Sequence, residues 1–518
     1  MASFYPTRPR SPSEPLFLER IDEQAAALAD APAVIDARGM LSWHELHARS
    51  LAVAQALVAA GGRRGERAAI AAGSTRDYVV VLVGILRAGM SAVPLSTMAS
   101  DELLRSLLAD CGARFLFADA RTAVRVDRLP SVPAHRIALG EAAAGWTSLT
   151  HWLEAAPADV ALPPPPAARD EFNIIYSSGT TGTPKGIVHD QALRAIQANA
   201  FAAFGLDRDA RTMLTTPLYS NYSLVALFGT LCGGGRIILS ERFDEGRFIE
   251  DCHRHGATHA FLVPEQITRI LVHPDVRRLG NDGPMTILSA GSPLRAARKR
   301  ELIERTGALL VEIYGATEGG ASTVLVANQF PDKLGSVGRP SQDCDIRIVG
   351  EDGREVAPGE TGEIVGRSAT MMQAYLRAPG ETAKLMWAAP DGQIFMRSGD
   401  IGYFDPDGFL HLADRKKDVI ISGGMNIYAS DLEEMLDRHP SVKASAVVAG
   451  PSERWGETPV AFVVADSDAP DTAELLAWVN LRLSRHQRIE RIRYVRDLPR
   501  NDMGKVVKKE LKQKLWEA

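Results

Sequence analysis

Apolar and polar positions follow two different periods along this chain, and they predict strands that alternate with helices from Glu19 onward. The apolar runs at 67–73 and 113–119 have the length and composition of buried strands. Between them, segment 76–89 has the apolar spacing of a helix, and Gly89 is its expected end. Strands and helices in alternation are typical of parallel sheets covered by helices, so the pattern predicts an α/β fold.

Two stretches interrupt this pattern. Residues 1–15 form a Pro/Ser-rich tail. Segment 155–172 contains four consecutive prolines, Pro163 to Pro166, and we expect a surface connector there, because proline fits neither a helix interior nor a central strand.

A domain boundary is predicted near residue 415, after a turn signal at 405–408 and a strand at 409–414. Beyond it we expect a helix at 430–440, with Ser430 as its N-cap and Glu433 completing a capping box. Strands at 443–451 and 458–466 and a helix at 473–483 complete a small α/β unit. We therefore predict two domains, 1–416 and 417–518.

Composition narrows the classes of function. The chain has 518 residues, too many for one ordinary core, and its 45% hydrophobic and 24% charged content is typical of globular proteins. A net charge of −5 gives no reason to expect a nucleic acid or an anionic membrane as partner. The four cysteines have no paired spacing, so neither a disulfide framework nor a zinc site is expected. Because the sequence shows neither an apolar targeting segment nor a membrane span, we expect a cytoplasmic protein. We expect it to be a monomer or a homodimer.

The loop YSSGTTGTPKG, at 176–186, is the strongest candidate for chemistry. Glycines let the backbone approach a ligand, while backbone amides and hydroxyls donate to phosphate oxygens, and Lys185 adds a positive charge. The loop differs from the common nucleotide-binding loop, because Pro184 precedes the lysine and Gly186 follows it. A flexible surface loop is the alternative, but the terminal lysine and the preceding strand favour a site for polyphosphate.

Six further motifs follow in a fixed order. They are EIYGATEGG (312–320), GSVGRP (335–340), GETGEIVGRS (359–368), RSGDIGYFDPDGFLHLADRKKD (397–418), ISGGMNIYASDLE (421–433) and LPRNDMGKVVKKEL (498–511). Together with the loop they resemble the adenylate-forming superfamily of acyl-CoA synthetases, luciferases and peptide-synthetase adenylation domains, and most of all bacterial carboxylate–CoA ligases. The resemblance covers nearly the whole chain. It implies a large domain of packed sheets and helices with a small β-barrel-like part, followed by a small mobile α+β domain.

The resemblance also implies an ATP site. Its expected residues are Ser177, Ser178, Gly179, Thr180, Thr181, Gly182, Thr183, Lys185, Gly291, Ser292, Pro293, Glu312, Ile313, Tyr314, Gly315, Asp400 and Arg415. Within it, Tyr314 is expected to stack on adenine, Asp400 to accept both ribose hydroxyls, and Arg415 to reach the ribose or a phosphate.

Three residues are implied to act in catalysis. Thr317 is expected to donate to the α-phosphate and Glu318 to bind Mg²⁺. Lys505 is expected to bridge carboxylate and phosphate oxygens, since two anions must meet as the adenylate forms.

The resemblance further implies a tunnel for a thiol substrate and a C-terminal domain that rotates between two reaction steps. By resemblance, Ser422, Gly423 and Gly424 line a tunnel for coenzyme A, and Lys417 is the hinge. The acyl pocket is expected to include Tyr219, Ser220, Asn221, Tyr222, Ala290, Gly291, Ala316, Gly319, Gly320 and Ala321. Ser220 replaces a histidine common in relatives, and Tyr219 or Tyr222 could take over its place.

The implied reaction has two halves. A carboxylate and ATP give an acyl adenylate and pyrophosphate, and coenzyme A then gives the acyl-CoA and AMP. Asn221 is neutral where amino-acid-activating relatives carry an aspartate, and no carrier motif follows Lys505. Because the pocket segments hold no Lys, Arg, His or Asp, we expect an acid with a neutral fatty, alicyclic or aromatic tail. An adenylation enzyme that loads a carrier in trans and a luciferase-like oxygenase remain alternatives. A non-catalytic nucleotide-binding regulator and a kinase fit less well.

Overall fold

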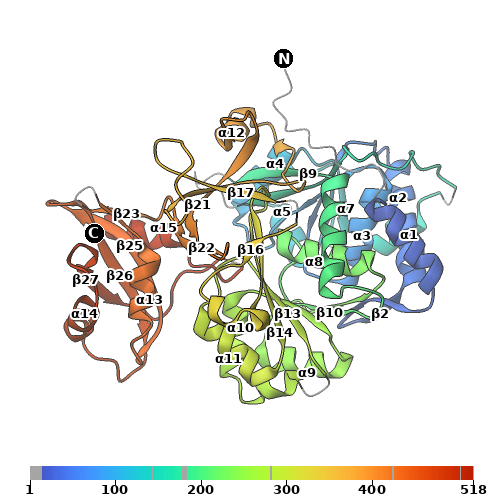
Figure 1. Cartoon of the computed structure of the whole chain (residues 1–518). Helices are drawn as coiled ribbons and strands as arrows, with labels where there is room; N and C mark the ends of the chain where they lie inside the picture. The colour runs from blue at the N-terminus through green and yellow to red at the C-terminus, as the bar shows by residue number, and fades with distance from the viewer. Residues whose placement is uncertain are drawn as a thin grey trace.

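The computed structural model describes residues 15–142, 144–157, 159–177, 184–280, 283–342, 344–422, 425–501 and 503–516. Within these ranges the chain builds four sheets. Three of them lie before residue 416, and the fourth begins at Ile420. In Figure 1 the segment from β23 onward, coloured red, lies beside the rest of the molecule.

The first large sheet has eight strands. In spatial order they are β19 (Ala374–Tyr375), β9 (Lys185–Asp190), β8 (Glu171–Ser177), β4 (Ser91–Pro94), β3 (Arg67–Ala71), β5 (Phe115–Ala118), β6 (His135–Ala138) and β7 (Thr147–Ser148). The strands from β8 to β7 are parallel, whereas β9 is antiparallel to β8. Strands β8 and β9 are therefore an antiparallel pair that adjoins the parallel strands of this sheet.

The second large sheet has nine strands. In spatial order they are β16 (Arg339–Pro340), β15 (Ser322–Val326), β14 (Leu309–Gly315), β13 (Thr286–Ser289), β12 (His259–Leu262), β10 (Arg211–Leu214), β11 (Arg236–Leu239), β1 (Pro32–Asp36) and β2 (Gly39–Ser42). Its central strands are parallel, as their unbroken apolar runs require of strands buried on both faces.

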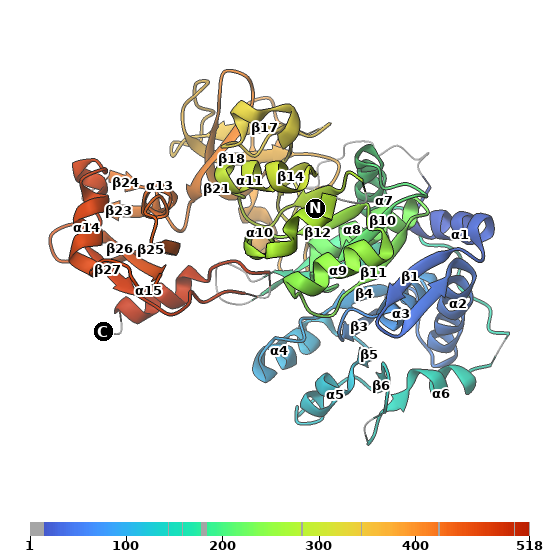
Figure 2. The ribbon, with the colours of Figure 1, turned by 90° about the horizontal axis from the view of Figure 1, so that it is seen from below.

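Helices separate and cover these two sheets (Figures 1 and 2). Between the sheets, in one continuous apolar core, lie α1 (Phe17–Leu28), α2 (Trp43–Ala59), α3 (Arg76–Arg87) and α8 (Asn221–Cys232), with α7 (Gln191–Ala200) beside them. The outer face of the first sheet packs against α4 (Asp101–Cys111) and α5 (Ala120–Val126). The outer face of the second packs against α9 (Glu245–His255), α10 (Pro264–Val272) and α11 (Ala296–Thr306). The short α6 (Leu149–Glu154) follows β7.

A small antiparallel sheet follows, built from β17 (Asp345–Val349), β18 (Gly362–Arg367), β20 (Met386–Ala388), β21 (Ile394–Phe404) and β22 (Leu410–Arg415), with α12 (Pro379–Lys384) beside it. The fourth sheet consists of β23 (Ile420–Ser422), β24 (Met425–Ile427), β25 (Val442–Ser452), β26 (Gly456–Ala465) and β27 (Arg491–Tyr494). It carries α13 (Ala429–Leu436), α14 (Thr472–Asn480) and α15 (Lys508–Trp516). The predicted fold class is confirmed; the domain boundary at residues 416/417 and the mobility of the small domain stay predictions.

One expected helix start is wrong. Helix α13 begins at Ala429, and Ser430 is not its N-cap. The Asp414 carboxylate of β22 instead accepts from the amides of Ala429, at 2.6 Å, and Ser430, at 3.4 Å. Glu433 accepts from the amide of Val447 at 2.8 Å, so it does not close a capping box. A carboxylate from a neighbouring strand thus caps this helix.

Within the described ranges, no helix combines the length and the apolar character needed to cross a bilayer.

Candidate active site

The predicted phosphate loop lies mostly outside the described residues. This applies to Ser178, Gly179, Thr180, Thr181, Gly182 and Thr183, and of Ser177 only the place at the end of β8 is described. Lys185 opens β9, and its Nζ lies 2.5 Å from Oε2 of Glu381 in α12. The same ammonium lies 5.1 Å from the centre of the Tyr375 ring. Lys185 is thus held in place by two residues that the motifs do not contain.

The carboxylate of Glu318 is a second neighbour of Tyr375. Strand β14 ends at Gly315, and the chain turns so that Oε1 of Glu318 accepts from the Tyr375 hydroxyl at 2.8 Å. Burial and the nearby Glu318 carboxylate raise the pKa of Tyr375, so the tyrosine keeps its proton and remains a donor. Lys185 and Glu318 come from motifs far apart in the sequence, and Tyr375 brings them together.

A second cluster surrounds Asp400 on β21. Its Oδ2 accepts from the Tyr314 hydroxyl at 2.9 Å, and its Oδ1 lies 3.0 Å from Nε of Arg415 on the neighbouring strand. Asp400 is 8% exposed, whereas the Arg415 side chain is 41% exposed. Each carboxylate oxygen has a second lone pair, so both can still accept from a ligand.

Lys505 completes this cluster from the C-terminal segment. A tight turn presents it: the Asn501 and Lys505 backbones are paired at 2.9 Å, and Gly504 has a φ of 70°. Burial, followed by the positive charge of Arg415, lowers the pKa of Lys505 to about 8, while Asp400 acts in the opposite direction. The structure therefore places Lys505 close to the residues that are predicted to bind ribose and phosphate.

Contacts between the N-terminal part and the C-terminal segment hold this arrangement. Arg500 lies 3.3 Å from Glu265 at the start of α10, and a Cβ on Gly504 would meet the Glu265 side chain at 2.9 Å. Arg295 and Asp437 form a further ion pair across the two parts. These contacts fix the direction from which Lys505 enters the cluster.

The loop after β13 is shaped by a buried ion pair. Glu312 is 1% exposed, and its Oε1 accepts from the amide of Leu294 at 2.8 Å, while Oε2 pairs with the buried Lys299. Lys299 also donates to the carbonyls of Leu334 and Ser336. The Glu312 side chain thus supports the loop that contains Gly291, Ser292 and Pro293. Contacts of these residues, and of Ile313 and Gly315, with a nucleotide stay predictions.

The residues of the expected acyl pocket have clear local roles. Ser220, in the place of the family histidine, is the N-cap of α8 and accepts from the amide of Ser223 at 3.2 Å. The Tyr222 hydroxyl donates to the carbonyl of Leu288, a residue of β13 in the second sheet, at 2.8 Å. Whether Tyr219 or Tyr222 takes the histidine's place stays a prediction. Asn221 has a buried Oδ1 with no hydrogen-bond partner, next to this site.

The small residues after Glu318 have a packing role. A Cβ on Gly319 would meet the carbonyl of Thr370 at 2.1 Å, and one on Gly320 would meet that of Gly366 at 3.0 Å. The backbone of 366–370 therefore packs directly against both glycines. Whether Ala290, Ala316, Gly319, Gly320 and Ala321 also line an acyl pocket stays a prediction.

The tunnel and hinge residues are only partly described. Ser422 ends β23 and pairs with Gly456, whereas Gly423 and Gly424 lie outside the described residues. Lys417 is exposed between β22 and β23, and the neighbouring Lys416 amide donates to Gly399 at 2.9 Å. Their functions stay predictions.

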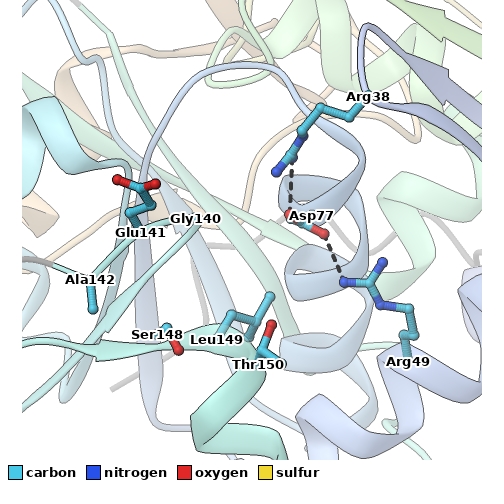
Figure 3. A pocket seen from close by; sticks show the side chains of 9 residues that line it. All are labelled: Arg38, Arg49, Asp77, Gly140, Glu141, Ala142, Ser148, Leu149 and Thr150. Carbon is cyan, nitrogen blue, oxygen red and sulfur yellow. Dashed lines mark hydrogen bonds and ion pairs between the residues drawn. The ribbon is translucent and has the colours of Figure 1, made fainter.

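A polar pocket lies outside the predicted active site. It has a volume of about 570 Å³, and an Asp77 carboxylate bridges two arginines at its wall (Figure 3). Its lining residues are Arg38, Arg49, Asp77, Gly140, Glu141, Ala142, Ser148, Leu149 and Thr150. None of them belongs to the predicted site.

Comparison with known proteins places the chain in a family. A model described as "AMP-binding enzyme" matches residues 21–376, and one described as "AMP-binding enzyme C-terminal domain" matches residues 431–505.

Curated relatives and solved structures agree with these matches. A feruloyl-CoA synthase from Amycolatopsis sp. is 34% identical over 481 residues, which cover 92% of this chain and 94% of the relative. A fatty acid–[acyl-carrier-protein] ligase, ScoC of Streptomyces coeruleorubidus, is 31% identical over 503 residues, or 94% and 93% of the two chains. The crystal structure of ATP-bound MatB from Rhodopseudomonas palustris superposes with a TM-score of 0.86 at 28% identity, over 97% of this chain and 99% of that chain. The chain therefore belongs to the family of AMP-binding enzymes, and the predicted adenylate-forming class of ligases is confirmed.

Proposed function

We propose that this enzyme is an AMP-forming carboxylic acid–CoA ligase. In the first half-reaction an oxygen of the acid attacks the α-phosphorus of ATP, and pyrophosphate leaves. In the second, the thiol of coenzyme A attacks the acyl carbon, and AMP leaves with the bridging oxygen. The observation that carries the proposal is the docking of the Lys505 turn against Glu265, which brings this cation within electrostatic range of Asp400 and Arg415 in the predicted nucleotide site.

Each charged residue has a defined task in this scheme. Lys505 offsets the repulsion between carboxylate and α-phosphate, an effect that is strong in a site shielded from water. Asp400, which accepts from the Tyr314 hydroxyl, holds the ribose of the nucleotide. Lys185 exchanges its ion pair with Glu381 for the phosphates that leave as pyrophosphate.

Glu318 is suited to hold a magnesium ion. Among the described residues no cluster of three or more His, Cys, Asp or Glu could hold a metal by itself. Mg²⁺ in nucleotide sites is commonly bound by one or two carboxylates together with substrate phosphates, and the Glu318 carboxylate, oriented by Tyr375, fits that pattern. When bound there, the ion neutralises phosphate charge.

The substrate of this proposed reaction is a carboxylic acid with an uncharged tail. The segments 219–223, 290–291 and 319–322 contain no Lys, Arg, His or Asp that could pair with a second charge on the substrate. Aromatic and fatty acids meet this requirement, and the names of the two curated relatives point to the same classes.

An acid panel tests the proposal directly. The enzyme is given ATP, Mg²⁺ and each acid, with coenzyme A in one arm and a phosphopantetheinylated carrier protein in the other. We expect AMP, pyrophosphate and an acyl-CoA from an aromatic or fatty acid. Thioester on the carrier alone would favour the second candidate, carrier loading as in ScoC. Pyrophosphate exchange with amino acids alone, or light emission with oxygen, would contradict the proposal.

A further inference from the structure

A buried arginine and a buried histidine lie directly behind the Thr317–Glu318 segment. Both are 0% exposed, Arg194 in α7 and His189 in β9. Nε2 of His189 lies 2.8 Å from the carbonyl oxygen of Thr317, and Nδ1 of the same ring lies 2.8 Å from Nη2 of Arg194. No sequence motif pointed to either residue.

The chemistry of the contacts fixes the position of each proton. A guanidinium only donates, so Nδ1 of His189 must accept from Arg194, and the ring proton must lie on Nε2. A carbonyl only accepts, so this proton is donated to Thr317. The histidine is therefore locked in one neutral tautomer, with its donor always directed at the same peptide group.

Arg194 is a buried cation with neutral partners. Besides His189, it donates to Oδ1 of Asn173 and to Oε1 of Gln197, each at 2.8 Å. Burial lowers the pKa of Arg194 to about 9, so it stays protonated at neutral pH. Burial and the Arg194 charge hold the pKa of His189 well below its usual value, so the ring stays neutral. Burying an unpaired charge is expensive, which indicates a role beyond packing.

Strand β9 carries both His189 and Lys185, so it connects this pair with the contacts around Tyr375 and Glu318. Residues 185, 187 and 189 share one face of the strand. Lys185 on that face contacts Tyr375, which donates to Glu318, and His189 contacts Thr317. One strand thus holds both residues of the predicted catalytic pair.

We propose that Arg194 and His189 are positioning residues for adenylation, which hold and polarise the peptide between Thr317 and Glu318. A carbonyl that accepts a charge-assisted chain of hydrogen bonds makes the N–H of the same peptide a stronger donor. Here that N–H belongs to Glu318, at the place where phosphate charge is expected to develop. The inference rests on the proposed function and deepens it.

Two substitutions separate this role from packing. In His189→Asn the amide oxygen replaces Nδ1 and still accepts from Arg194, but nothing donates to Thr317. In His189→Gln the longer amide reaches the Nε2 position and still donates to Thr317. We expect His189→Asn to lower kcat for acid-dependent ATP–pyrophosphate exchange by about 10- to 100-fold, by analogy with the range found for residues that orient metal ligands. The KM for ATP and thioester formation from supplied acyl adenylate should stay close to wild type, and His189→Gln should recover most of the rate.

His259 provides a matched control. This histidine is also buried, and its Nε2 lies 2.9 Å from the carbonyl of Phe204, away from the site. His259→Asn removes an equivalent bond, so it should lower Tm as much as His189→Asn does and leave exchange unchanged.

The outcomes are distinct. Equal exchange rates in His189→Asn and His189→Gln, or a loss in His259→Asn as large as in His189→Asn, would overturn the inference. A ring proton on Nδ1 of His189 in the wild-type enzyme, seen by ¹⁵N NMR of labelled histidine, would overturn it without any variant. Absence of exchange with every acid in the wild type would overturn the proposed function as well.

Discussion

Asp400 lies where three functional groups meet. It accepts from Tyr314, pairs with Arg415 and faces the charge of Lys505. Sequence reasoning identified these four residues through motifs. It could not identify Tyr375 and Glu381, which contact Glu318 and Lys185, because their contacts arise only when β19 and α12 fold back against β9.

Loss of the Asp400 carboxylate should weaken ATP binding. Hydrogen bonds to a charged group contribute about 1.5–3 kcal/mol each, so loss of two should raise the KM for ATP at least about tenfold in Asp400→Ala. Asp407→Ala, on the nearby turn where the carboxylate pairs with Lys333, is the control and should keep the wild-type KM. Equal KM values in the two variants would contradict the ribose assignment.

The protonation state of Lys505 should appear in the pH profile. With a pKa of about 8, the ammonium is present at lower pH and is lost as pH rises through this value. Because kcat/KM reports groups of the free enzyme, kcat/KM for adenylation should fall above about pH 8. Lys505→Arg keeps its charge, and its profile should stay flat to higher pH. A falling limb at the same pH in both enzymes would assign it to another group.

At the scale of elements, the local apolar pattern predicted a strand or helix correctly wherever that pattern alone determines the element. Segment 76–89 became α3, and the runs at 67–73 and 113–119 became β3 and β5. The start of α13 was wrong because its capping carboxylate, Asp414, comes from another strand. The sequence did not predict the roles of Arg194 and His189 for the same reason. The contact that suggests their role is with Thr317, which is distant in the sequence.

The Asp414 cap can be tested by stability. Asp414→Ala leaves two amides of α13 without their acceptor, and an N-cap contributes about 0.5–2 kcal/mol, so the free energy of unfolding should fall by that amount. The control Asp431→Ala removes the same charge from the first turn of α13 without removing a cap. Urea denaturation measures both. An equal loss of unfolding free energy in the two variants would mean that the negative charge, and not the cap, stabilises α13.

At the scale of the whole molecule, the C-terminal segment is docked in one orientation. Arg500, Gly504 and Asp437 contact the N-terminal part, and Lys505 lies beside Asp400 and Arg415. In the proposed scheme, this arrangement serves the first half-reaction. For the second half-reaction the resemblance implies a rotation of the C-terminal segment that brings segment 422–424 forward, and this rotation stays a prediction.

The two half-reactions should therefore respond differently to loss of Lys505. Lys505→Ala should lower the rate of adenylation by about 10²–10³-fold, the scale for one electrostatic stabiliser of a transition state. Thioester formation from supplied acyl adenylate and coenzyme A should be nearly normal. Lys509→Ala, an exposed lysine in α15, should leave both steps unchanged. Equal loss of both steps in Lys505→Ala, with the fold intact by circular dichroism, would contradict the rotation.

The central claim is that the acid attacks the α-phosphorus and that AMP leaves with the acid's oxygen. An accepted acid labelled with ¹⁸O in its carboxylate is turned over with ATP and coenzyme A, and AMP, pyrophosphate and any phosphate are analysed by mass spectrometry. The account predicts one ¹⁸O atom in each AMP and none in pyrophosphate. Label in inorganic phosphate with release of ADP, or AMP without label, would contradict it.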